Sequence, residues 1–467
     1  MEPTRAPFRS WGCRLCAASD RSVAATSVRL ALVVVSGLMA GACGEGTSSN
    51  TTTSASPTPS SALTQVYVAL GDAFTAGMVS NALVESHQAY SFPAQIARQG
   101  GTADFQQPLV STPGIDVELE LRRFYQGPIQ IAPRATTPGH ALNASLTSPY
   151  NNLGVPGAKL ADLLSTSGTT VGFHSLVLRS FGTALTQANR LRPSLVTLWI
   201  GNSDILSAVI AARAVDGVTL TPASQFETNI AAAIKSLTTG TSATIFVANI
   251  PDFTRAPFAS SIKPYVVDAT TGEPKLKDGQ RIALIGPQST PLPSSALVTL
   301  AASELLANGD GIPVSAGGNG KSLPDEVVLN QDEVDKIRAR IDSANRAIVK
   351  AAGDAGIDVV DLHALFEELA STGRTVGGLK VDSTFLTGGV FGYDGVHLTD
   401  LGYALVANEW ITVINDNGGA IPLIDLSPIM GIASGPGVTS GPAPTPPFRF
   451  SAEAMAGLQA TYGTGAQ

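Results

Sequence analysis

The sequence predicts an α/β protein: a three-layer αβα sandwich around a mostly parallel central sheet. Short, continuous apolar runs rich in β-branched residues alternate with longer stretches in which apolar residues recur every three or four positions. Strands that are apolar on both faces require helices on both sides of the sheet. With 467 residues, of which 44% are hydrophobic, the chain is long enough to bury a large core.

The predicted strands and helices alternate along the chain after about residue 65. The predicted strands are "QVYVAL" (65–70), "LVTLWI" (195–200), "ATIFVAN" (243–249) and "IDVVDL" (357–362). The predicted helices span 175–191, 224–237 and 331–353. Because ligands of such sheets bind beyond the carboxyl ends of the strands, the residues that follow each strand are the candidate functional positions.

The amino terminus reads as a targeting segment. Arg21 and Arg29 precede the apolar run "LALVVVSGLMAGAC", which is too short to span a bilayer, so residues 1–42 are predicted to be a signal peptide. Small residues before Cys43 resemble a bacterial lipoprotein signal, which implies lipidation of Cys43; ordinary cleavage after Ala42 is the alternative. A polar Ser/Thr/Pro tether at 43–64 would follow the lipid.

These features predict an exported protein of the cell envelope, anchored by lipid in the outer membrane or facing the periplasm. The first 42 residues carry five Arg against Glu2 and Asp20, so a chain that starts at Cys43 has a formal charge of −8 − 3 = −11. That balance disfavours nucleic acid as a partner. Cys13 and Cys16 lie upstream of the apolar run, and the exported domain has no disulfide.

Four short motifs occur in order along the chain, and the first and third of them come directly after predicted strands. They are Gly71-Asp72-Ala73, the loop "NNLGVPGAKLADLL" (151–164), Gly201-Asn202-Ser203-Asp204, and "DGVHLTDLGYALVANEW", in which Asp394 precedes His397 by three residues. Together, from about residue 66 to 414, they resemble the four blocks of the SGNH, or GDSL, hydrolase family. The resemblance implies a flavodoxin-like three-layer fold and hydrolysis of carboxylic esters.

The family's residue roles map onto this sequence with two departures. The catalytic Asp and His fall on Asp394 and His397, and the Gly that donates to the oxyanion falls on Gly157, with Gly154 as the less favoured position. The nucleophilic Ser falls on Ala73, and the oxyanion Asn falls on Ser203. No metal or cofactor is implied, since the other four histidines have no metal-ligand spacing.

Ala73 offers no oxygen to acylate, and loss of the nucleophile costs on the order of 10⁶ in turnover in a serine protease. Loss of one oxyanion donor costs roughly 10² to 10³. Thr75 and Ser203 are the other hydroxyls considered as nucleophiles, and His397 with Asp394 could instead activate water.

The predicted function is therefore ester hydrolysis impaired by Ala73, on acyl or acetyl esters of lipid, glycan or small molecules. The alternative is a non-catalytic envelope lipoprotein that binds an ester or saccharide in the inherited cleft. The hydrolase-type domain is expected at 65–420, with insertions at about 101–150 and 255–324 walling the cleft. A Gly/Pro-rich tail at 421–467 is expected to be mobile or strapped to the surface. The sequence does not define an oligomeric state.

Overall fold

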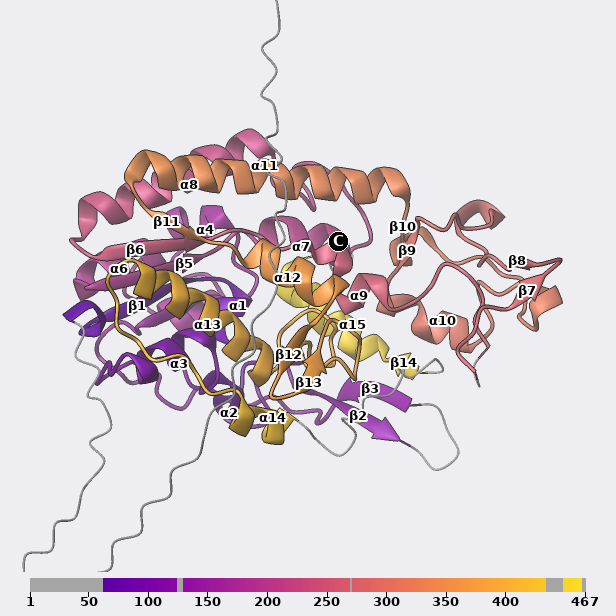
Figure 1. Cartoon of the computed structure of the whole chain (residues 1–467), viewed down its shortest axis with the longest axis horizontal. Coiled ribbons are helices and arrows are strands. Elements are labelled where there is room, and N and C mark those ends of the chain that lie inside the picture. Colours follow the sequence, from indigo (N-terminus) through magenta and orange to yellow (C-terminus); the bar gives the residue numbers. More distant parts are fainter. Residues whose placement is uncertain (1–61, 124–128, 269–270, 434–447, 464–467) are drawn as a thin grey trace, which may run out of the picture. The chain divides into compact units, whose positions relative to one another are not determined.

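The computed structural model describes residues 62–123, 129–268, 271–433 and 448–463 (Figure 1). The predicted signal peptide, Cys43 and all but the last three residues of the tether lie outside these ranges. Within them, no helix is both long and apolar enough to cross a membrane.

The central sheet contains five parallel strands, which confirms the predicted fold class. In spatial order they are β11 (Asp358–Val360), β6 (Thr244–Ala248), β5 (Leu195–Trp199), β1 (Tyr67–Gly71) and β4 (Asn152–Gly154). Every residue of β1 and β5, two of the three inner strands, is buried, because both faces of the sheet are covered. Four of the strands match the predicted runs; β4 has only three residues and was not predicted.

Helices cover the sheet on both sides. Helix α8 packs against α11, and α3 packs against α13, and the two pairs run along opposite sides of the strands in Figure 1. The helices are α1 (Ala73–Ala76), α2 (Glu85–Gln88), α3 (Phe92–Gln99), α4 (Leu160–Ser165), α5 (Phe173–Leu178), α6 (Ala184–Leu191), α7 (Ser203–Ile210), α8 (Ala223–Gly240), α9 (Pro257–Ser260), α10 (Ser303–Ala307), α11 (Gln331–Ala355), α12 (Leu362–Ser371), α13 (Asp400–Asp416), α14 (Ser427–Ala433) and α15 (Ala452–Tyr462).

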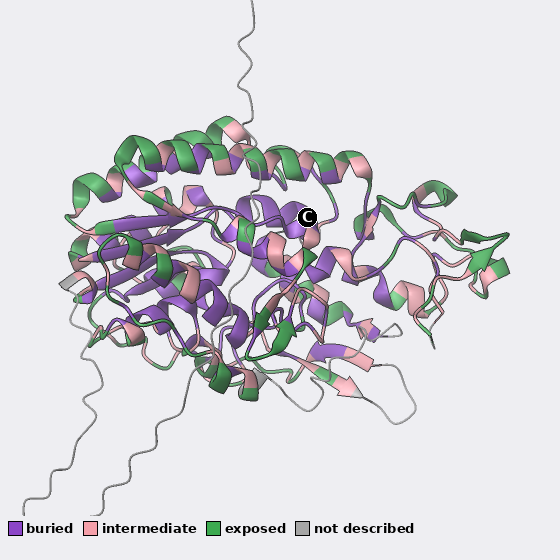
Figure 2. Cartoon of the chain, viewed as in Figure 1, coloured by how far each residue is buried: buried purple, intermediate pink, exposed green. Residues whose placement is uncertain are grey.

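The longest helix, α11, illustrates how the sequence pattern sets the layers. Its buried residues Val334, Ile337, Ile341 and Ile348 recur at helical spacing, so one face packs inward and the opposite face is exposed (Figure 2). Asn330 caps its first turn by accepting a hydrogen bond from the backbone N–H of the residue three positions on. Both the predicted helix at 331–353 and the one at 224–237 are present, each slightly longer than predicted.

The predicted helix at 175–191 forms two helices, α5 and α6. The chain leaves the helical region at Arg179, with φ of 50°, and again at Gly182, with φ of 94°. Arg179 is held there because its guanidinium donates to the carbonyl oxygens of Leu146 and Ser148. Tertiary hydrogen bonds therefore override the helical pattern at this point.

Shorter elements lie mainly in the two insertions. They are β2 (Leu119–Arg123), β3 (Ile129–Pro133), β7 (Leu276–Lys277), β8 (Gln280–Arg281), β9 (Leu297–Val298), β10 (Val328–Leu329), β12 (Arg374–Val376) and β13 (Leu379–Val381), with 3-10 turns at Ala62–Thr64, Phe253–Arg255, Pro287–Ser289, Leu300–Ala302, Val314–Ala316 and Asp325–Val327. A last strand, β14 (Phe448–Phe450), pairs in parallel with β3, and β3 pairs with β2. The carboxyl-terminal segment thus joins the sheet of the first insertion.

Candidate active site

A buried histidine and aspartate meet in the loop before α13. The Nδ1 atom of His397 lies 2.8 Å from Oδ2 of Asp394, and both side chains are fully buried. The backbone N–H groups of Val396 and His397 donate to Oδ1 of Asp394, and that of Asn81 donates to Oδ2. These contacts fix the carboxylate as an acceptor, so Nδ1 carries the proton and Nε2 presents its lone pair.

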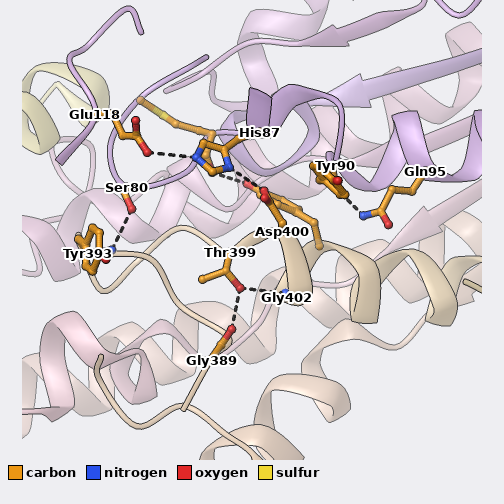
Figure 3. Close-up of polar contacts among 12 residues, drawn as sticks. Ser80, His87, Tyr90, Gln95, Glu118, Gly389, Tyr393, Thr399, Asp400 and Gly402 are labelled. Carbon is orange, nitrogen blue, oxygen red and sulfur yellow. Dashed lines mark hydrogen bonds and ion pairs between the residues drawn. The ribbon is translucent and has the colours of Figure 1, made fainter. Parts of the chain in front are cut away.

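Contacts around the loop hold this pair in place (Figure 3). Ser80 Oγ accepts a hydrogen bond from the backbone N–H of Tyr393, one residue before Asp394. Thr399 caps α13 by accepting from the N–H of Gly402, and its hydroxyl donates to the carbonyl of Gly389. Both ends of the loop are therefore tied to the surrounding structure.

His87 forms a second set of contacts that hold the start of α13 in place. His87 lies between two carboxylates, 2.8 Å from Asp400 and 3.1 Å from Glu118 (Figure 3). Arg134 pairs with the same Glu118 carboxylate. Burial alone would lower the pKa of His87, but the hydrogen bonds and charges of Asp400 and Glu118 outweigh it and raise the pKa to about 10. His87 is therefore a cation at neutral pH, and it links the first turn of α13 to the first insertion.

Ala73 begins α1 directly after strand β1. Its side chain is fully buried in a small apolar cluster with Ala76, Met78, Leu83 and Val110. The ring of the next residue, Phe74, packs 5.6 Å from the His397 ring, measured between centroids. The first motif thus reaches the His397 site, but position 73 supplies a methyl group and no oxygen.

The third motif lies beside the first. Asn202 Nδ2 donates to Oδ2 of Asp72 at 3.0 Å, while the N–H of Phe74 donates to Oδ1. Burial raises the pKa of Asp72 to about 7, although hydrogen bonds from Phe74, Asn202 and the backbone of Ser203 oppose the shift. The side chain that bridges the two motifs is therefore Asn202.

Ser203, onto which the oxyanion Asn maps, is the first residue of α7 and is buried. Its Oγ has no hydrogen-bond partner among the described residues, and neither has Oδ1 of Asn202. Asp204 has a structural role, because its carboxylate accepts from the N–H of Leu160 and the hydroxyl of Thr221. A buried hydroxyl without a partner is uncommon, and this one is free to donate to a ligand oxygen.

Gly157 lies in the loop after β4 and adopts a φ of 76°, which favours glycine. A side chain at this position would collide with the carbonyl oxygen of Thr461. Gly154, the less favoured position, packs directly against the backbone of α1. Thr75 Oγ1 points to the carbonyl of Trp199 on β5, and this contact occupies the hydroxyl considered as a substitute nucleophile.

A residue that the sequence analysis missed completes the site. The hydroxyl of Tyr462, in the last turn of α15, lies 2.8 Å from Nε2 of His397, and the two rings are stacked. Burial raises the pKa of Tyr462 well above its usual range, and the charges of Asp72 and Asp394 add to this. The phenol is therefore protonated and donates to Nε2, the nitrogen that would activate a nucleophile.

Residues 67–410 match the family described as GDSL-like Lipase/Acylhydrolase. A search of curated proteins found no match. Similar solved structures include an acetyl xylan esterase, AlAXEase, with 14% identity over 74% of this chain and 98% of that chain and a TM-score of 0.31. They also include a Clostridium thermocellum family 3 carbohydrate esterase, with 15% identity over 76% of this chain and 98% of that chain and a TM-score of 0.30.

Proposed function

The chain belongs to the GDSL-like lipase/acylhydrolase family, and we propose that it is a carboxylic-ester hydrolase weakened by the absence of a nucleophile at Ala73. The observation that carries the proposal is the intact pair of His397 and Asp394, with Nδ1 fixed as the donor and Nε2 as the base. A methyl group at position 73 excludes an acyl-enzyme there. What remains is water activated by His397.

The expected chemistry follows from the groups present. With the phenol of Tyr462 displaced, a water molecule would take its place and lose a proton to Nε2 as the water oxygen bonds to the ester carbonyl carbon. The protonated Nε2 would then give this proton to the leaving alkoxide as the ester C–O bond breaks, which releases the acid and the alcohol. The carbonyl oxygen would be stabilised by the N–H groups of Ala73 and Gly157 and by the hydroxyl of Ser203. Without the covalent step, turnover should fall by roughly 10⁶ from that of a complete centre, leaving about 10³ to 10⁴ over water.

A specific observation favours a second candidate function. Because Tyr462 occupies Nε2 and its ring is buried at 3% exposure, the site described is closed. A base that is already occupied suits a non-catalytic envelope protein, anchored through lipid on Cys43, which would bind an ester or saccharide in this cleft when Tyr462 moves away. The support for the anchor is the run of small residues before Cys43 and the polar tether after it.

Hydrolysis of p-nitrophenyl acetate and butyrate separates the two candidates. We expect slow turnover above the buffer rate that His397→Gln abolishes, and no fluorophosphonate adduct at position 73 detected by mass spectrometry. His140→Gln serves as the matched control, because His140 is exposed and bonds only to Ser111. Equal rates for the wild type and His397→Gln would refute hydrolysis and leave ligand binding, measured by thermal shift with sugar acetates.

A further inference from the structure

The last turn of α15 contacts several of the motifs that form the site. The Tyr462 hydroxyl bonds His397, the Tyr462 carbonyl accepts from Ser207 Oγ on α7, and the Thr461 carbonyl lies against Gly157. The Thr461 hydroxyl donates to the carboxylate of Asp116 in the first insertion. Two consecutive residues of α15 thus contact His397, the loop that holds Gly157, helix α7 and the first insertion.

The contact of Tyr462 with His397 occupies the place that a nucleophile takes in an ester hydrolase. In an ester hydrolase the oxyanion donors bind the carbonyl oxygen of the ester, and the hydroxyl of the nucleophile lies on the base. Here the hydroxyl of Tyr462 lies on Nε2 of His397, and the carbonyl oxygen of Thr461 lies against Gly157 on the side where a Cβ would be. The last turn of α15 therefore covers Nε2 of His397 and one side of Gly157.

Both insertions hold this segment in place. The first supplies β3, whose residues Ile129 to Ile131 pair with β14. The second supplies Ser303, whose Oγ accepts from the N–H of Phe450, and Phe258, whose ring packs edge-on against Phe450. The backbone N–H of Phe258 also donates to the carbonyl of Gly395, between Asp394 and His397. The expected cleft walls therefore serve as the support of α15.

Helix α15 itself is built for close approach. Ser451 caps its first turn, and Ala454, Leu458 and Tyr462, spaced four residues apart, are buried on one face. Gly457 faces Asn81, whose backbone N–H bonds Asp394, and a side chain at 457 would collide with the Asn81 amide. The absence of a side chain at position 457 leaves room for the buried Asn81 amide beside the helix.

We propose that α15 is an internal ligand of the ester-binding cleft, and that its last turn holds the site closed to substrates. The inference rests on the proposed function only in assuming that the cleft accepts esters. Hydrolysis is then limited both by the missing nucleophile at Ala73 and by the covered base His397. Tyr462 would then be a blocking residue, and its phenol is not a nucleophile.

Chemical modification of His397 tests the closure without relying on hydrolysis. Diethyl pyrocarbonate acylates accessible neutral imidazoles, and mass spectrometry reports each histidine separately. In the wild type, His397 should react at least about tenfold more slowly than the exposed His140, because modification must await opening of the helix. Tyr462→Ala should raise the His397 rate at least about tenfold, whereas Tyr462→Phe, which keeps the ring, should leave it low.

A second variant undocks the helix while keeping Tyr462. Gly457→Leu places a side chain against Asn81 and should expose His397 to the reagent. Gly353→Leu is the matched control, because it adds the same side chain within α11, where nothing lies within 4 Å. Circular dichroism establishes that each variant is folded. A wild-type His397 that reacts as fast as His140, or one that stays protected in folded Gly457→Leu, would overturn the proposal.

Activity of a restored nucleophile separates this inference from the proposed function. Ala73→Ser alone should stay within about tenfold of the wild type, and Ala73→Ser with Gly457→Leu should exceed it by at least about 100-fold. If Ala73→Ser alone gains that activity, closure is wrong and ester hydrolysis stands. If the double variant exposes His397 but remains inactive, the hydrolase proposal fails and closure stands. A fluorophosphonate adduct on wild-type Tyr462 would overturn closure in favour of a tyrosine nucleophile.

Discussion

Replacing Asp72 by Asn should make the protein's stability less sensitive to pH. Asp72 is fully buried between the first and third motifs, and burial raises its pKa from 3.8 to about 7. The Asn side chain can still accept from the N–H of Phe74. Its amide can donate to Oδ1 of Asn202, which has no partner in the described structure, if the Asn202 amide turns over.

The magnitude follows from the difference between the folded and unfolded pKa values. Because the folded pKa is the higher one, the folded state holds the proton more tightly, and this stabilisation is complete below pH 3.8. It is lost as the pH rises from 3.8 to about 7, where the unfolded chain has already ionised. A shift of roughly three units corresponds to about 4 kcal/mol, at about 1.4 kcal/mol per unit.

Urea unfolding at pH 4, 6 and 8 measures this difference. The free energy of unfolding of Asp72→Asn minus that of the wild type should rise by about 4 kcal/mol across the series. Asp216→Asn, which removes an exposed carboxylate paired with Arg340 and Lys336, is the control and should show no such rise. If the free energy of unfolding varied with pH in the same way for Asp72→Asn and the wild type, burial would not raise the pKa of Asp72, and the prediction would be wrong.

Three further outcomes are expected. His87→Gln should lower the free energy of unfolding by about 1.5 to 3 kcal/mol at pH 6 and change it little above pH 10. The folded pKa of His87 is raised to about 10, so the bonds of its imidazolium to Asp400 and Glu118 stabilise the protein fully below pH 6.5, and this stabilisation is lost as the pH rises towards 10. Equal losses in urea titrations at both pH values would contradict this. Gly201→Ala should destabilise by more than about 2 kcal/mol, since φ is 105° and the new methyl meets the Phe226 ring; an unchanged melting temperature would contradict that strain. Cys43→Ser should release the protein from the membrane fraction, and unchanged fractionation would refute the anchor.

The sheet could be predicted because its strands are apolar on both faces. The runs at 65–70, 195–200 and 243–249 stand out from the sequence, and each observed strand begins and ends within two residues of its run. The roles of Asp394 and His397 were implied by the family resemblance, and the structure brings these two side chains to 2.8 Å from one another in the loop before α13. The sequence thus predicted the strands, because local residue patterns determine them.

The closure of the site could not be predicted, because distant contacts decide it. The segment 448–463 carries a readable helix signal in Ser451, the buried positions spaced by four, and Gly463 after the last turn. Nothing local says where that helix docks. The contacts of Tyr462 with His397 and of Thr461 with Asp116 span 65 and 345 positions. The tail at 421–467 was expected to be mobile or strapped to the surface. In the structure its last helix, α15, contacts His397 through Tyr462.

The position of α15 in the chain orders the events of biosynthesis. Ribosomes make the protein from its amino terminus, so the five strands, His397 and both insertions exist before residues 448–463 emerge. The pairing of Phe448 with Ile129 spans 448 − 129 = 319 positions, and such distant contacts form late because a long loop must close first. A nascent chain would thus display an open base and oxyanion loop, and the mature molecule would seal them as its last folding step.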